Sequence, residues 1–81
     1  MKVGTKIESI GNFLFADHSR PSKKSWRIRK GDKGQIVEST DAIYVHPVLA
    51  TDAIFVRFGW DVFALDANQI NSYVRIRDMI G

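Results

Sequence analysis

Apolar and polar residues alternate with a period of two along most of the chain. The alternation is clearest in "VGTKIESI" (residues 3–10), "IFVRF" (54–58) and "SYVRIRDMI" (72–80), and the bulky "FLF" at 13–15 extends the first of these. A period of two is typical of β-strands with one buried face. No segment has a helix-period apolar stripe longer than two turns. The pattern therefore predicts an all-β protein.

The alternation also predicts which side chains point inward. In the first strand Val3, Thr5 and Ile7 share a face, and in the last strand Val74 and Ile76 point inward while Arg75 and Arg77 point outward. We expect the strand at 54–58 to be central, with the side chains of Ile54, Val56 and Phe58 facing one way.

The segments between these strands have the composition of turns and loops. "ADHSRPSKKS" (residues 16–25) is small, polar and charged and contains a proline, which predicts a long loop. Extended structure resumes at Trp26 and Ile28, which lie two residues apart on one face, so Trp26 is expected at or near the core. The alternative is an exposed Trp26 that anchors a partner.

Later breaks follow the same logic. Gly31 and Gly34 bracket a tight turn, Gly59 makes another, and Pro47 limits a loop or hairpin excursion in "TDAIYVHPVLATDA". "DANQI" predicts a single helical or 3₁₀ turn capped by Asp66. Trp60 has two interpretations, an exposed aromatic platform with Phe55 or Tyr73, or a buried plug at one end of the fold.

Five to six short antiparallel strands, a long basic loop and one short 3₁₀ turn together predict a small Src-homology-3-like (SH3-like) barrel. Closure of the sheet is how a small all-β domain avoids exposed edges. An OB-like barrel is the alternative, but it usually contains a longer helix midway. We expect residues 1–81 to form a single barrel domain, because 81 residues suffice for one core.

The composition of the chain limits the cellular compartments and the kinds of site that we expect. Hydrophobic residues make up 44% of the chain, and there is no cysteine. The absence of cysteine excludes disulfides and thiolate metal sites, and it favours a reducing, cytoplasmic compartment. The apolar runs are far shorter than the roughly 20 residues of a membrane-spanning helix. The start of the chain, "MKVGTKIES", lacks the continuous apolar region of a secretory signal.

Positive charge is concentrated in one stretch. Residues 18–33 contain seven cations and one anion, Asp32, while the net charge of the whole chain is +3. Such a concentration can attract an acidic protein surface or a phosphate backbone. The candidate partner-binding residues are Arg20, Lys23, Lys24, Trp26, Arg27, Arg29, Lys30 and Lys33. Solvation of a long loop is the alternative explanation for the same cations.

No residue pattern supports catalysis, a metal or a cofactor. Asp17-His18-Ser19 contains the residue types of a hydrolase triad, but sequence neighbours cannot adopt the geometry of one. His18 and His46 are too far apart to supply a metal-ligand motif. Gly31-Asp32-Lys33-Gly34 lacks the spacing of a phosphate-binding loop. We therefore predict that the protein is not an enzyme and has no cofactor of its own.

Three pieces of the chain resemble a group of small barrels from oxygenic photosynthesis. They are Val3-Gly4-Thr5-Lys6-Ile7, the Gly31-x-x-Gly34-x-Ile36-Val37 turn into a strand, and Val56-Arg57-Phe58 followed by "FALD" and Gln69-Ile70. The chain is similar to photosystem I subunit IV (PsaE) and to the variable chain of ferredoxin–thioredoxin reductase. The resemblance implies a non-catalytic accessory subunit, peripheral to a membrane complex, that helps to dock an acidic electron carrier such as ferredoxin.

Two hypotheses on function follow. In the first, the basic loop docks an acidic protein partner. In the second, the same cations and Trp26 bind nucleic acid, since the Gly-x-x-Gly turn also occurs in KOW-type nucleic-acid-binding barrels. A phage- or plasmid-encoded inhibitor that mimics or blocks such contacts is a variant of either. The sequence gives no indication of the oligomeric state.

Overall fold

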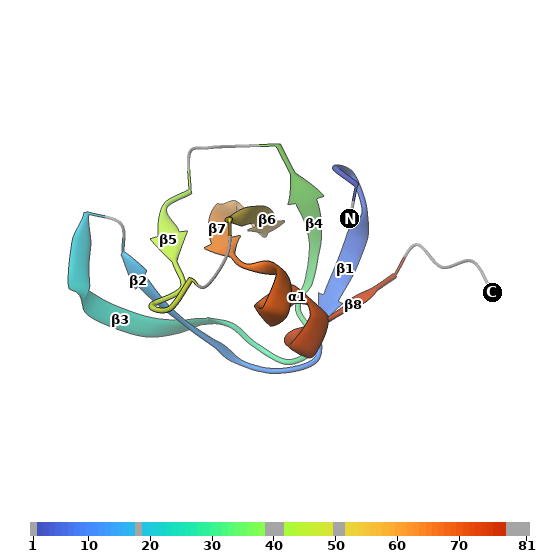
Figure 1. Ribbon diagram of the computed structural model, residues 1–81. Coiled ribbons are helices and arrows are strands. Elements are labelled where there is room, and N and C mark those ends of the chain that lie inside the picture. The colour runs from blue at the N-terminus through green and yellow to red at the C-terminus, as the bar shows by residue number, and fades with distance from the viewer. Residues whose placement is uncertain (1, 18, 39–41, 50–51, 78–81) are drawn as a thin grey trace.

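The strands form one strongly curled sheet in the computed structural model, which describes residues 2–17, 19–38, 42–49 and 52–77 (Figure 1). In chain order the elements are β1 (Lys6–Ser9), β2 (Phe13–Asp17), β3 (Arg20–Ile28), β4 (Lys33–Val37), β5 (Tyr44–Val45), β6 (Ile54–Phe58), β7 (Asp61–Leu65), α1 (Ala67–Tyr73) and β8 (Val74–Ile76). The strand order across the sheet is β3-β2-β5-β7-β6-β4-β1-β8. The described part of the chain is therefore mostly β, as the alternation predicts.

The sheet is curled into a half-barrel around a core of inward-facing side chains. The buried cluster consists of Ile7, Phe13, Phe15, Ile28, Ile36, Val56, Phe58, Phe63, Leu65, Ile70 and Val74. Phe63 lies at its centre, because its ring centroid is 4.6 Å from that of Phe15 and 6.2 Å from that of Phe58. Aromatic contacts of this kind add to the stabilisation from apolar burial alone. The central position predicted for residues 54–58 is confirmed, since β6 lies between β4 and β7.

The strand count and one pairing differ from the predicted barrel. The described residues form eight strands rather than five or six. The two-residue strand β5 pairs with β7 in parallel, at Tyr44–Phe63 and Val45–Ala64, whereas every other pairing is antiparallel. This short strand lies between β2 and β7 and connects the two halves of the sheet.

The predicted 3₁₀ turn is a short α-helix. Asp66 caps α1 as expected, and Gln69 completes a capping box: the Asp66 carboxylate accepts from the Gln69 amide N–H, and the Gln69 side chain accepts from the Asp66 N–H, both at 2.9 Å. Ile70 inserts into the core. The reciprocal bonds satisfy two backbone donors of the first turn, which stabilises a helix of only seven residues. It is the one helix in the described residues, and no helix there is long and apolar enough to cross a membrane.

Ile76 shares the face of buried Ile7, but the side chains at the two ends of the alternating pattern are exposed. Val3 precedes β1 and is 59% exposed, and Ile76 is 41% exposed. Ile76 lies opposite Ile7 on β8, the edge strand of the sheet, where no further strand covers it. The alternation of apolar and polar residues therefore continues into the edge strand, but the apolar side chains there are no longer fully buried.

The glycines of the Gly31-x-x-Gly34 motif serve two different purposes. Gly31 has a φ of +93°, as a tight turn requires, and Gly59 has a φ of +64° in the β6–β7 turn. Gly34 is instead an extended residue of β4 opposite Phe58. A Cβ at position 34 would lie 2.5 Å from the Arg57 carbonyl oxygen and 2.9 Å from the Phe58 ring. Gly34 therefore permits close packing between β4 and β6.

We expect Gly34→Ala to destabilise the protein more than Gly59→Ala does. The first change forces apart two central strands, at a cost of about 3 kcal/mol. The second meets no atom within 4 Å and costs only the left-handed backbone penalty, about 1 kcal/mol. Thermal unfolding followed by circular dichroism would test the order, and Gly34→Ala should lower Tm by more than about 10 °C. An equal or smaller loss for Gly34→Ala would contradict the close approach.

Candidate partner-binding surface

The basic segment is a strand and not a loop. Residues Arg20–Ile28 form β3, which pairs only with β2 and is an edge strand of the sheet. The prediction of a long loop at 16–25 is therefore wrong. Polar residues and Pro21 are poor strand formers, but an edge strand tolerates them because one side of its backbone needs no partner. Figure 1 shows β3 on the outside of the sheet, with β2 between it and β5.

A β-bulge turns Trp26 out of the core. Ile28 lies opposite Phe13 and Trp26 lies opposite Leu14, so two steps on β3 match a single step on β2. Phe13 and Leu14 are neighbours on β2, so their side chains face opposite sides of the sheet. Their partners Ile28 and Trp26 therefore face opposite sides as well, although they are two residues apart on β3. Ile28 is consequently fully buried, whereas Trp26 is 56% exposed beside half-buried Leu14. The expectation that Trp26 packs at the core is wrong for this reason.

The turn after β3 is held firmly against the opposite end of the sheet. The Asp32 carboxylate accepts from the Arg29 N–H at 2.9 Å, and the Lys30 N–H donates to the Asn12 side-chain oxygen at 2.9 Å. The Ser9 N–H donates to the Asp32 carbonyl oxygen and the Gly31 N–H to the Ser9 carbonyl oxygen, both at 2.8 Å. These bonds fix the backbone from which Arg29 and Lys30 project. Asp32, the acidic residue within the basic stretch, is occupied in building the turn.

All eight candidate partner-binding residues are exposed, but they form a strip and not one cluster. Arg20, Lys23 and Lys24 lie on the outer half of β3, while Lys33 is on β4 beyond the turn. At roughly 3.3 Å per residue, the nine residues of β3 span about 30 Å if fully extended. Arg27 lies over the Tyr44 ring, 4.5 Å from its centroid, in a cation–π contact.

Within the residues that the structure describes, no cation of the strip forms an ion pair, although the charges of Arg20 and Arg27 act on Asp17. The ion pairs found there join Arg75 and Arg77 to Glu8, with N–O distances of 3.1 and 4.0 Å. Asp17 accepts hydrogen bonds from the backbone N–H of Ser19 at 2.9 Å and from its hydroxyl at 2.8 Å. These bonds, followed by the charges of Arg20 and Arg27, hold the pKa of Asp17 below its ordinary value.

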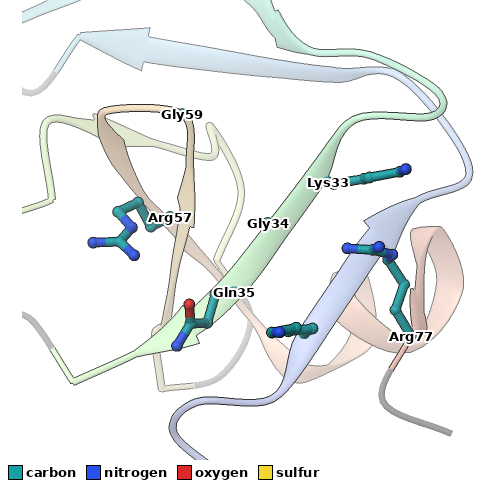
Figure 2. A pocket seen from close by; sticks show the side chains of 7 residues that line it. Lys33, Gly34, Gln35, Arg57, Gly59 and Arg77 are labelled. Carbon is teal, nitrogen blue, oxygen red and sulfur yellow. The ribbon is translucent and has the colours of Figure 1, made fainter. Parts of the chain in front are cut away.

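Sequence reasoning missed a second group of cations. Lys6, Lys33, Arg57 and Arg77 line a shallow hollow of about 320 Å³ together with Gly34, Gln35 and Gly59 (Figure 2). Lys33 is the one residue of the strip that reaches it. These cations are scattered over 72 positions of sequence, so no local run signals them. The sequence alone could have placed these side chains on the outward faces of predicted strands. It could not have given the strand order that brings them together.

Of the polar groups considered for catalysis, Asp17, Ser19 and His46 take part in contacts within the fold. Asp17 and Ser19 bond to one another in the β2–β3 turn, and His18 between them lies outside the described residues. The His46 ring contacts Phe13 and Phe15 edge-on, and its Nδ1 lies 2.8 Å from Gln69 Nε2. Within the described ranges no three His, Asp or Glu side chains are grouped to hold a metal ion.

The hydrogen bonds of Asp17 give a pH prediction. Because folding lowers its pKa, the ionised carboxylate stabilises the hairpin above about pH 4, and this contribution is lost as the pH falls through the folded-state pKa. Ser19→Ala should raise the Asp17 pKa toward its ordinary value, and by more than Arg20→Gln does. Carboxyl ¹³C shifts followed by NMR would measure both. A larger rise in Arg20→Gln would show that charge, not hydrogen bonding, dominates.

Comparison with known proteins identifies no relative of this chain. No family model, curated protein or solved structure matches the chain. What the surface binds has to be inferred from its own residues.

Proposed function

We propose that the protein is a non-catalytic binding module that docks an acidic protein through strand β3 and the turn after it. The contact surface consists of Arg20, Lys23, Lys24, Trp26, Arg27, Arg29, Lys30 and Lys33. The cations attract the partner and orient it, and Trp26 supplies the apolar contact. Charged groups at the rim of an interface mainly raise the association rate, whereas a buried tryptophan slows dissociation.

The exposure of Trp26 is the observation on which this proposal depends. A tryptophan that is 56% exposed on an edge strand leaves a large apolar surface in water. The bulge that places it there costs β2–β3 pairing, and a regular register would have turned the same ring inward. Arg and Trp are among the residues enriched at the centres of protein interfaces.

Protection of the sheet edge explains part of β3 without any partner. Lysines, a proline and bulges all prevent an edge strand from pairing with another chain, and β3 has Lys23, Lys24, Pro21 and two register shifts. Edge protection does not explain an exposed Trp26, because an aromatic side chain on an edge promotes association instead of preventing it.

The resemblance suggests which acidic partner to test first. A curled, mostly antiparallel sheet with a short helix before its last strand supports an SH3-like barrel. If the chain is functionally similar to photosystem I subunit IV or the reductase variable chain, the partner is an acidic electron carrier such as ferredoxin. The module would then act in the cytoplasm, at the periphery of a membrane complex.

Charge reversal on β3 should abolish docking while the protein stays folded. We expect Lys23→Glu, Lys24→Glu, Arg27→Glu and Arg29→Glu in combination to weaken binding to immobilised plant-type ferredoxin by at least about tenfold, mainly through a slower association rate. Trp26→Ala should weaken binding by a similar factor through faster dissociation. Surface plasmon resonance at several salt concentrations would measure both rates.

Two double variants with the same change in net charge test whether the position of the altered residues determines the loss of binding. Lys23→Glu/Lys24→Glu changes β3, and Lys2→Glu/Arg57→Glu changes the net charge equally at exposed residues outside β3, one before β1 and one on β6. We expect only the first pair to reduce affinity strongly. Equal losses in the two pairs, or unchanged affinity in the fourfold variant with intact folding, would contradict docking through β3.

A further inference from the structure

A second cationic surface lies on the outer face of the sheet, over four adjacent strands. Its hollow of about 320 Å³ is lined by Lys6 of β1, Lys33 and Gln35 of β4, Arg57 of β6, and Arg77, which follows β8. Figure 2 shows Lys33 and Gln35 in the middle, with Arg57 on one side and Arg77 on the other. None of the described residues that line the hollow is acidic.

The register of the sheet aligns these side chains across the strands. Lys6 pairs with Gln35, Gln35 pairs with Arg57, and the Arg77 N–H donates to the Lys6 carbonyl oxygen at 2.8 Å. Paired residues point to the same face of a sheet, and neighbouring strands lie about 4.8 Å apart. The row from Arg57 to Arg77 therefore spans three steps, or about 14 Å. That length fits a short run of an extended polyanion better than a single small anion.

The cations of this face differ in whether an acidic residue lies beside them, and Glu8 is the cross-strand neighbour of Lys33. Glu8 is the outward carboxylate on β1, and it pairs with Arg75 at 3.1 Å and more loosely with Arg77 at 4.0 Å. Arg57 and Lys33, both exposed, have no ion pair in the described part of the chain. Cations gathered in a hollow produce a positive potential that attracts a negatively charged strand.

An exposed aromatic residue follows directly on one that lines the hollow. Trp60 is 98% exposed at the tip of the β6–β7 hairpin, directly after Gly59, which lines the hollow. A tryptophan that anchors a protein interface is usually surrounded by contacts that exclude water. Trp60 stands alone at a tip, where both faces of the ring are accessible, and such a ring suits stacking on a nucleic-acid base.

We propose that the outer face of β8, β1, β4 and β6 binds single-stranded nucleic acid. Phosphates occupy the hollow against Lys33, Arg57 and Arg77, and a base stacks on Trp60. This site is separate from the protein-docking strip on β3 and shares only Lys33 with it. The two proposals can therefore succeed or fail independently.

Fluorescence anisotropy with a labelled oligothymidylate, titrated over a range of salt concentrations, tests the site. If three phosphates are neutralised, log K should fall with log salt with a slope of about −2. Arg57→Gln/Arg77→Gln should weaken binding at least about tenfold and make that slope shallower. Trp60→Ala should weaken binding by about fivefold to a hundredfold and leave the slope unchanged, because stacking releases no counterion.

The control is Lys23→Gln/Lys24→Gln, which removes the same charge from β3. It should change oligothymidylate affinity much less than Arg57→Gln/Arg77→Gln does. Circular dichroism should show that all variants are folded, because none of the altered side chains is buried; that of Arg77 is 34% exposed. Absence of binding at low salt would overturn the proposal. So would equal losses in the two double variants, an unchanged affinity in Trp60→Ala, or competition by polyglutamate as effective as that by unlabelled oligothymidylate.

Discussion

The sheet can bury only one of its faces, and this constraint places most of its charged side chains on the other face, with buried Asp66 at the cap of α1 as an exception. Inward side chains form the cluster around Phe63, and Gly34 lets β4 and β6 approach closely enough to close it. Ionised groups cannot enter such a core without a large desolvation cost. Outward positions on the same strands therefore hold the charged side chains, such as Lys6, Glu8 and Arg57. The core thus fixes the pattern of the surface as well as the curl of the sheet.

Local departures from regular alternation then decide which aromatic residues reach the surface. The bulge opposite Phe13 and Leu14 exposes Trp26, and the tight turn at Gly59 exposes Trp60. Trp26 lies between cations on the basic strip, and Trp60 directly follows Gly59, which lines the hollow. The two surfaces differ in kind, because the strip runs along one edge strand, whereas the hollow crosses four strands.

Regular alternation made the strand at 54–58 predictable, and the residue types of "DANQI" made the Asp66 cap predictable, because both features depend on local sequence. Strand β3 was not predictable, since its Ser, Lys and Pro residues have loop-like propensities and only pairing with β2 holds them extended. The position of Trp26 depends on a single extra residue in the register, and period-two counting cannot detect one. The hollow depends on which strands are neighbours, so residues as distant as Lys6 and Arg77 meet only in the fold.

The central claim is that Trp26 faces solvent within a positive potential, and paired quenching of tryptophan fluorescence tests it most directly. A Trp60→Phe variant leaves Trp26 as the one tryptophan of the chain. Iodide should quench its emission much more efficiently than caesium does, and the difference should shrink as inert salt screens the cations. Weak quenching by both ions would show a buried ring, and equal quenching would show no local positive potential. Either result would contradict the account.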